Sequence, residues 1–192
     1  MPLTINDLAI STAPEIWFWM FDGDLEAREQ CLTAWWESDD SMFSHRLGRV
    51  IEDAGSPVGL ELGYTNAEKH DRVAATVSIA SSILKPSIRD HLLSCFGWFD
   101  YLCPPIPDDA YYVQWLATSP DVQGRGLGRQ LLTEVFERSR SRGLKQVHLD
   151  VNSTNPAVGF YKHVGMEIVS ESRVPFLERH NIPSHYRMAK HQ

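Results

Sequence analysis

Residues 122–132 read VQGRGLGRQLL. Three glycines alternate within them, at Gly124, Gly126 and Gly128. An extended apolar run, Tyr111–Ala117, comes before, and an amphipathic helical pattern follows. Such a strand–loop–helix leaves backbone N–H groups unpaired at the positive end of a helix dipole, and glycine lets a phosphate approach them closely. The sequence therefore predicts a pyrophosphate site, to which Arg125 and Arg129 add positive charge.

Two common phosphate-binding loops do not fit this stretch. The chain contains no Gly-Lys pair, so the P-loop pattern is absent. A dinucleotide fingerprint needs glycine at its sixth position, which is Arg129 counted from Gly124 and Leu131 counted from Gly126. The pattern Gln-x-x-Gly-x-Gly does fit, at Gln123, Gly126 and Gly128. A glycine-rich turn without a ligand is the alternative for so short a pattern, and the flanking sequence decides between the two.

The flanking sequence predicts a regular order of elements. A helical stripe follows the loop, at Leu127, Leu131, Leu132, Val135 and Phe136. Alternation at 147–151 predicts a strand, and Asn155-Pro156 predicts the cap and first residue of a second helix that ends at Gly165. Met166–Val174 and His185–Ala189 are predicted strands. The predicted order from Tyr111 onward is β–α–β–α–β–β.

This order, together with residues 160–166, FYKHVGM, resembles the Gcn5-related N-acetyltransferase (GNAT) superfamily over residues 111–189. The family pattern places an asparagine seven residues before the tyrosine of its second block, whereas Asn155 and Tyr161 are six apart. The resemblance implies a GNAT fold of the α/β (α+β) class. That fold has a central mixed, mostly antiparallel twisted sheet flanked by helices and splayed between its two central strands. It implies one acetyltransferase domain over residues 1–192.

The resemblance also implies a coenzyme A site. The backbone of the splayed strand would pair with the pantetheine arm, the glycine loop would hold the pyrophosphate, and Asn155 would lie near the second helix. The implied cofactor-binding residues are Leu116, Ala117, Thr118, Gln123, Gly124, Arg125, Gly126, Leu127, Gly128, Arg129, Asn155 and Tyr161. Acetyl-CoA would be the co-substrate. No metal is expected, because His180 and His185 have no third ligand at a suitable spacing.

Amide formation from a thioester needs an uncharged amine, and deprotonating a lysine-like amine at pH 7 costs about 4–5 kcal/mol. The resemblance implies Leu116 N–H as the oxyanion donor and Tyr161 as the proton donor to the thiolate. A helix aromatic packed on the sheet is the alternative for Tyr161. The resemblance also implies Asp150, on the strand before the second helix, as the base, and a solvated or helix-paired carboxylate is the alternative. Other members of the family place a glutamate on the splayed strand, where this chain has Tyr112 or Gln114 instead, and Glu61 is a third option.

The composition limits which kinds of partner and which compartment are expected. The chain has 192 residues, 43% hydrophobic content and a net charge of −7, which fits a globular protein and argues against non-specific nucleic-acid binding. No 18-residue apolar run or leader pattern is present, so neither a membrane partner nor secretion is expected. Three cysteines without Cys-x-x-Cys spacing fit reduced thiols and a cytoplasmic protein. Oligomeric state stays open, with a homodimer as one arrangement.

The N-terminal half carries weaker patterns. It predicts helices at Ala13–Phe21 and Glu26–Trp36, a hairpin of Arg49–Glu52 with Val58–Tyr64, and strands at Val73–Ile79 and Leu3–Ile5. Residues 85–109 are predicted to be a helical insert rich in aromatic residues, which either pack on the core or cover the acceptor.

The function implied is an acetyl-CoA-dependent N-acetyltransferase that transfers acetyl directly to a primary amine of a small molecule or peptide. The alternatives are a non-catalytic CoA-binding or regulatory module on the same fold, an acyltransferase using another acyl-CoA, and a nucleotide-phosphate binder.

Overall fold

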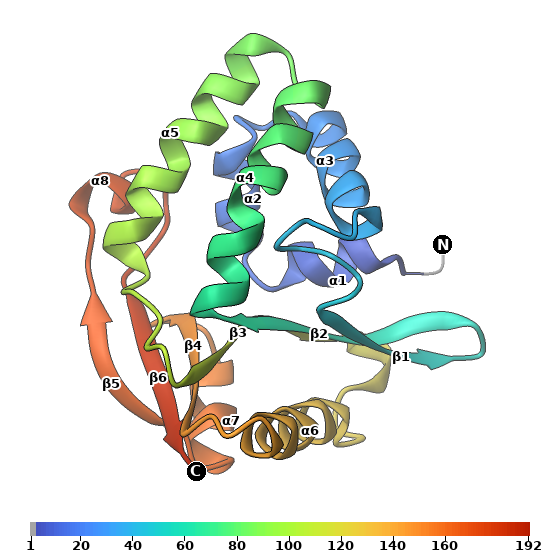
Figure 1. The fold of residues 1–192 in the computed structure, drawn as a ribbon, viewed down its shortest axis with the longest axis vertical. Helices are drawn as coiled ribbons and strands as arrows, with labels where there is room; N and C mark the ends of the chain where they lie inside the picture. Colours follow the sequence, from blue (N-terminus) through green and yellow to red (C-terminus); the bar gives the residue numbers. More distant parts are fainter. Residues whose placement is uncertain (1–2) are drawn as a thin grey trace.

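The computed structural model describes residues 3–192 and contains one six-stranded sheet in the order β1-β2-β3-β4-β6-β5 (Figure 1). The strands are β1 (Gly48–Asp53), β2 (Ser56–Thr65), β3 (Ala110–Thr118), β4 (Gln146–Asn152), β5 (Glu167–Ser172) and β6 (His185–His191). Neighbouring strands are antiparallel except β3 and β4, which are parallel. The predicted mixed, mostly antiparallel sheet is therefore confirmed.

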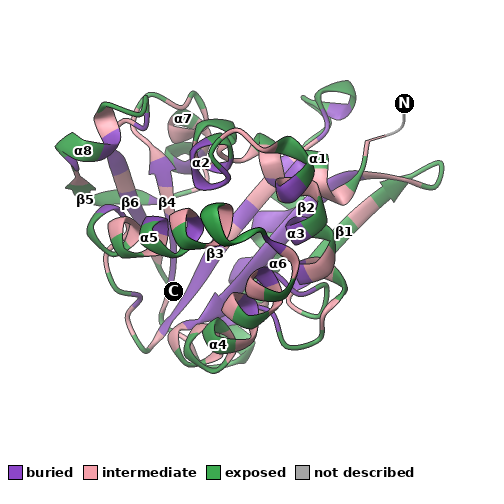
Figure 2. Cartoon of the chain, turned by 90° about the horizontal axis from the view of Figure 1, so that it is seen from above, coloured by how far each residue is buried: buried purple, intermediate pink, exposed green. Residues whose placement is uncertain are grey.

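Helices cover both faces of the sheet. They are α1 (Ile5–Ser11), α2 (Pro14–Met20), α3 (Leu25–Glu37), α4 (Asn66–Ile83), α5 (Pro86–Leu102), α6 (Leu127–Ser141), α7 (Ala157–His163) and α8 (Pro175–Glu178). Helices α1–α5 lie on one side, and α6 and α7 on the other (Figure 1). The inner strands β2, β3, β4 and β6 are mostly buried, whereas the edge strands β1 and β5 are mostly exposed (Figure 2). Each face has its own apolar core. No helix within residues 3–192 is long and apolar enough to span a bilayer.

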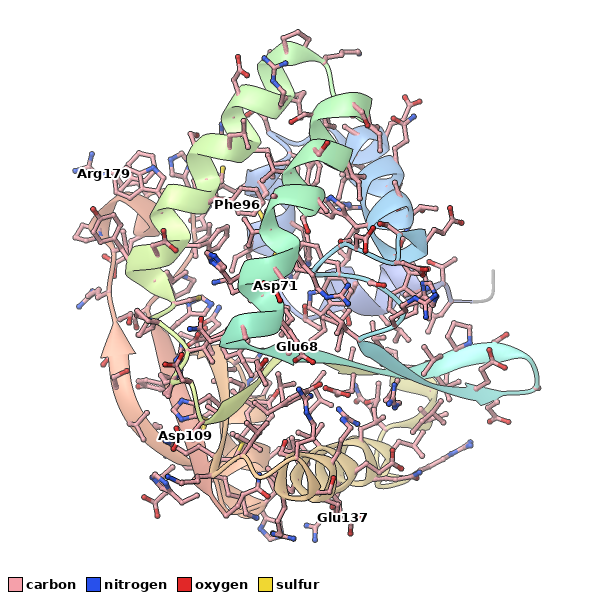
Figure 3. All side chains as sticks on the ribbon, in the orientation of Figure 1. Glu68, Asp71, Phe96, Asp109, Glu137 and Arg179 are labelled. Atoms are coloured by element: carbon pink, nitrogen blue, oxygen red, sulfur yellow. The ribbon has the colours of Figure 1, made fainter. Side chains whose placement is uncertain are left out.

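The glycine loop leads directly into α6, as predicted. The buried residues of this helix include four of the predicted stripe, Leu131, Leu132, Val135 and Phe136. Glu137 lies on the opposite face and points away from the sheet (Figure 3). An amphipathic helix buries its apolar stripe against the sheet, and this packing fixes where its N-terminus lies relative to β3.

In the N-terminal half the two helices and the hairpin are confirmed, as α2, α3 and the β1–β2 pair. The strand predictions at Val73–Ile79 and Leu3–Ile5 are wrong, because the first lies inside α4 and α1 begins at Ile5. A capping box starts α4, in which the Thr65 and Glu68 side chains each accept the other residue's backbone N–H. The capping box sets the start of the 18-residue helix, whereas the strand prediction considered residues 73–79 on their own.

The segment at 85–109 does contain a helix, α5, which begins at Pro86 as predicted. Phe96 and Phe99 are half-buried and pack against the core on this side of the sheet. Phe96 lies where α5 faces α4 (Figure 3). Trp98 instead stacks on Phe176, with ring centroids 4.2 Å apart, and so ties α5 to α8.

A buried ion pair joins α6 to the sheet. Arg138 Nη2 lies 2.7 Å from Glu61 Oε2 and 3.0 Å from the Tyr111 hydroxyl, which itself donates to Glu61 Oε1 at 2.9 Å. The Glu61 side chain is 1% exposed. Burial raises the pKa of Glu61, although Arg138 and Tyr111 oppose that rise. The charge on Glu61 therefore depends on its two partners.

Removing only one partner should be costly. Arg138→Met is expected to lower the free energy of unfolding by about 2–3 kcal/mol, because it leaves a buried carboxylate unpaired. The double variant Glu61→Leu/Arg138→Met removes both charges and should recover most of that loss. Urea denaturation of both variants checks this. A double variant as unstable as the single one would show that lost packing, not the unpaired charge, dominates.

Candidate active site

Strands β3 and β4 separate part-way along their length. They pair only from Ala110↔Gln146 to Val113↔Leu149. The register with β2 also shifts here, because Leu62 pairs with Trp115 and Gly63 with Val113, so Gln114 is an extra residue. A bulge of this kind bends its strand and disrupts the ladder locally. The predicted splay between the two central strands is thus present in the fold, and the bulge lies where it begins.

The backbone of β3 beyond the bulge has an open edge. Ser119 N–H donates to Val58 O at 2.8 Å. Hydrogen-bonded and non-hydrogen-bonded pairs alternate along an antiparallel ladder. Thr118 and Leu116, opposite Gly59 and Glu61, therefore direct their N–H and C=O groups away from β2 and toward the gap. These are the peptide groups that a strand-like ligand could pair with.

The glycine loop brings unpaired donors to the same end of β3. Gly124 and Gly126 both have φ of +81°, and Gly126 is the cap of α6 without any side-chain cap bond. The first helical hydrogen bond found here runs from Gln130 N–H to Gly126 O. The N–H groups of the preceding helical residues have no partner within the helix, which makes this helix end a place for an anion. The loop residues 123–126 are exposed.

Helix α7 supplies the far wall of the gap. Asn155 Oδ1 accepts the Ala157 N–H at 2.8 Å, but the cap residue of α7 is Pro156, so the helix begins at Ala157, one residue later than predicted. Tyr161 is the buried residue of α7, and its hydroxyl makes no hydrogen bond with any described part of the chain. Burial raises the pKa of Tyr161 to about 12. The phenol is therefore neutral across the physiological range and has a proton available to donate.

One cavity of about 1090 Å³ connects these features. Seven predicted site residues line it, Leu116, Ala117, Thr118, Gln123, Asp150, Asn155 and Tyr161. The predicted loop residues Gly124, Arg125, Gly126, Leu127, Gly128 and Arg129 do not line it and lie next to Gln123 along the chain. Arg125 forms an exposed ion pair with Asp53 of the β1–β2 hairpin at 3.5 Å. The fold thus brings the splayed strand, α7 and Asp150 together, with the glycine loop beside them.

Asp150 is bound tightly by its neighbours. Arg187 donates to both carboxylate oxygens at 2.7 Å, and the Tyr112 hydroxyl donates to Oδ2 at 2.9 Å. The Asp150 side chain is 2% exposed. Burial alone would lower the pKa of Arg187, but the ion pair with Asp150 raises it. Arg187 also donates to the carbonyls of Pro104 and Pro105, so this cluster anchors the chain that follows α5.

Glu61, the other acidic option, lies elsewhere. Its partners Arg138 and Tyr111 belong to the α6 side of the sheet, and Glu61 does not line the cavity. Gln114 stands at the bulge, where its Oε1 accepts the Tyr64 hydroxyl at 2.6 Å. Arg187 and Gln114 carry no role that the sequence patterns predicted. The i+2 spacing of His185 and Arg187 on a predicted strand is a signal that could have placed both on one face.

No group of three or more His, Cys, Asp or Glu side chains suited to a metal ion occurs in the part of the chain that the structure describes.

Comparison with known proteins agrees with the fold. The family model described as "Acetyltransferase (GNAT) family" matches residues 11–166. The chain belongs to this family. An acetyltransferase of known structure superposes with a TM-score of 0.68 at 15% identity, covering 97% of this chain and 92% of the other. A GNAT family acetyltransferase from Elizabethkingia anophelis with acetyl-CoA bound gives 0.52 at 13% identity, covering 100% and 96%.

Two curated relatives match over shorter stretches. A protein named mycothiol acetyltransferase from Brachybacterium faecium is 31% identical over 105 residues, which are 54% of this chain and 31% of that protein. Another of that name, from Saccharomonospora viridis, is 42% identical over 55 residues, which are 28% of this chain and 18% of that protein. The matched region therefore spans less than a third of each of these two relatives.

The loop glycines should differ in what they tolerate. Gly126→Ala is expected to lower the free energy of unfolding by about 1–2 kcal/mol, because its φ of +81° disfavours any Cβ. Gly128→Ala should be neutral or stabilising by up to about 1 kcal/mol, because it lies within α6 and the nearest atom to a new Cβ, on Phe160, is 3.7 Å away. Thermal denaturation of the two variants tests this. Equal losses in both would contradict the distinction.

Proposed function

We propose that this protein is an acetyl-CoA-dependent N-acetyltransferase that transfers acetyl directly from the thioester to a primary amine. The observation that carries the proposal is the open edge of β3 at Leu116 and Thr118, which faces the same cavity as Tyr161. Family membership supports acetyl transfer as the reaction class. The names of the curated relatives support a small-molecule acceptor.

The chain's residues fit acetyl-CoA, the co-substrate that supplies the thioester. Nothing lies within 4 Å of a Cβ placed on Gly124 or Gly126, so the loop surface is open to a phosphate. We propose that the helix-start N–H groups from Leu127 to Arg129 bind the pyrophosphate and that Leu116 and Thr118 pair with the pantetheine amides. Ala117, Gln123 and Asn155 would line the groove between these two parts, and the side chain of Arg125 would add charge at its mouth.

At the reacting carbon, the Leu116 N–H is proposed to stabilise the oxyanion of the tetrahedral intermediate. Tyr161 is proposed to donate a hydrogen bond to the departing thiolate. A phenol with a pKa near 12 is a weaker acid than a thiol of about 8.5, so complete proton transfer is uphill by about 5 kcal/mol. Stabilisation by a hydrogen bond therefore fits Tyr161 better than full transfer early in the reaction.

The family resemblance implied that Asp150 is the base. Its oxygens accept three hydrogen bonds, from Arg187 and Tyr112. We propose that its charge acts by holding these two side chains in the wall of the acceptor half of the cavity. The aromatic side chains of α5 that line the cavity, Phe96 and Phe99, would then form the apolar part of the acceptor site.

CoA binding tests the pyrophosphate part of the proposal. Gly128→Ala should fold normally and bind CoA about tenfold more weakly, a loss of about 1.4 kcal/mol, because the new methyl group stands beside the helix-start N–H groups. Isothermal titration calorimetry measures this. Gly97→Ala is the control, since Gly97 lies within α5 with nothing within 4 Å of its Cβ. Unchanged CoA affinity in the Gly128 variant would contradict the proposed cradle.

Thermal shift with CoA, ATP and NAD separates the rival functions. Stabilisation by CoA alone is expected. Equal stabilisation by all three would favour a general nucleotide-phosphate binder. CoA binding without thiol release on any amine would favour a non-catalytic module.

Tyr161→Phe tests the chemical step. We expect kcat to fall about 10- to 100-fold, because a hydrogen bond to a charged group contributes about 1.5–3 kcal/mol, while KM for acetyl-CoA stays close to wild type. The ratio of wild-type kcat to Tyr161→Phe kcat should be constant from pH 6 to 9, because the pKa of Tyr161 near 12 keeps the phenol protonated over this range. Thiol release from acetyl-CoA is the readout. An unchanged kcat would remove Tyr161 from the reaction.

A further inference from the structure

The cavity wall contains an imidazole, that of His185, for which no catalytic role was predicted. His185 opens β6, is 6% exposed and lines the same cavity as Leu116 and Tyr161. Its Nδ1 lies 3.0 Å from the Pro183 carbonyl oxygen. A carbonyl can only accept, so Nδ1 carries the hydrogen and the neutral ring has its lone pair on Nε2. Nε2 makes no hydrogen bond with any residue from 3 to 192.

The sheet register puts His185 on the acceptor side of the reacting centre. Pairing between β3 and β4 ends at Val113↔Leu149, and beyond that point Leu116 on β3 and Asn152 on β4 line the same cavity. Asn152 pairs directly with His185 on β6. Paired residues share a face. On the same strands Asp150 pairs with Arg187, which lies over the Tyr112 ring and donates to the Pro104 carbonyl on the α5 side of the sheet. His185 thus faces the half of the cavity opposite to α6.

We propose that His185 Nε2 is the proton acceptor for the attacking amine, reached directly or through one water. This proposal rests on the proposed acetyltransferase function. The ammonium gives one proton to Nε2, and the amine nitrogen then forms a bond to the thioester carbon. The C–S bond breaks, the second nitrogen proton goes to the thiolate, and His185 returns its proton to solvent. The net products are the amide, the free thiol and one proton.

Charge around the imidazole favours this role. Burial lowers the pKa of His185, while the Pro183 carbonyl, Asp150 on β4 and Glu15 on α2 oppose the decrease. Arg187 is two residues away on the same strand and is paired with Asp150. Glu171 on β5 accepts from Ser184 and pairs with Tyr186, so it lies on the other face. The ring is therefore neutral at pH 7 and able to accept a proton, whereas the lone pairs of Asp150 are already engaged.

The test variant is His185→Asn. The Asn amide can still donate to the Pro183 carbonyl, but the Nε2 lone pair is gone. We expect kcat/KM for the amine to fall about 100-fold at pH 7. In wild type, kcat/KM should decrease as pH falls through a pKa below 6.5, where His185 becomes protonated, and this acid limb should be absent in the variant. The difference in kcat/KM between wild type and His185→Asn should become smaller as pH approaches the amine's own pKa, because more of the amine is then already deprotonated. A structural role alone would not produce that recovery.

His185→Gln is the second variant, and CoA affinity with the thermal midpoint checks that each variant folds. His70→Gln, at an exposed position of α4 outside the cavity, is the matched control and should keep the wild-type profile. An active wild type together with a His185→Asn variant that keeps its rate and its acid limb would overturn this inference alone. A wild type that releases no thiol from acetyl-CoA with any amine would overturn the proposed function and this inference with it.

Discussion

On the side that faces β4, the peptide groups of β3 beyond Val113 have no neighbouring strand to pair with, and the arrangement of the site follows from this. Buried backbone N–H and C=O groups need a partner, so an open edge inside a sheet is stable only beside water or a ligand. The extra residue Gln114 bends β3 away from β4, and the gap between them becomes the cavity. Leu116 and Thr118 face that gap because the alternation of the β2–β3 ladder continues past the bulge.

Two consecutive tyrosines hold this strand from opposite faces. The Tyr111 hydroxyl joins Glu61 and Arg138, which fasten α6 and with it the glycine loop. The Tyr112 hydroxyl joins Asp150, whose partner Arg187 fastens the chain after α5. Each cluster is a buried ion pair that is completed by a phenol. The two clusters therefore set the positions of the two walls between which a thioester and an amine would meet.

The C-terminal half was predictable because its signals are local. The glycine loop and the stripe of α6 depend on residues a few positions apart, and the structure has both where the pattern indicated. The N-terminal half was harder, and the segment 73–79 shows why. Its β-branched residues favour a strand when taken alone, but a capping box eight residues earlier starts a helix that runs through it. The strand preference of residues 73–79 was overridden by the capping box at Thr65, which lies outside that segment.

The amino-acid sequence alone was enough to predict the order of elements around the loop, the family that the chain resembles and the candidate residues Tyr161 and Asp150. It could do so because backbone conformation and amphipathic period are properties of short segments. Only the tertiary structure decided which of those side chains are free to react. Asp150 is engaged because Arg187, from a strand 37 residues later, lies against it, and His185 lies in the cavity wall because β6 pairs with β4 at Asn152. Hydrogen-bond partners brought together by the sheet decide where a lone pair is left over, and no spacing along the chain records this.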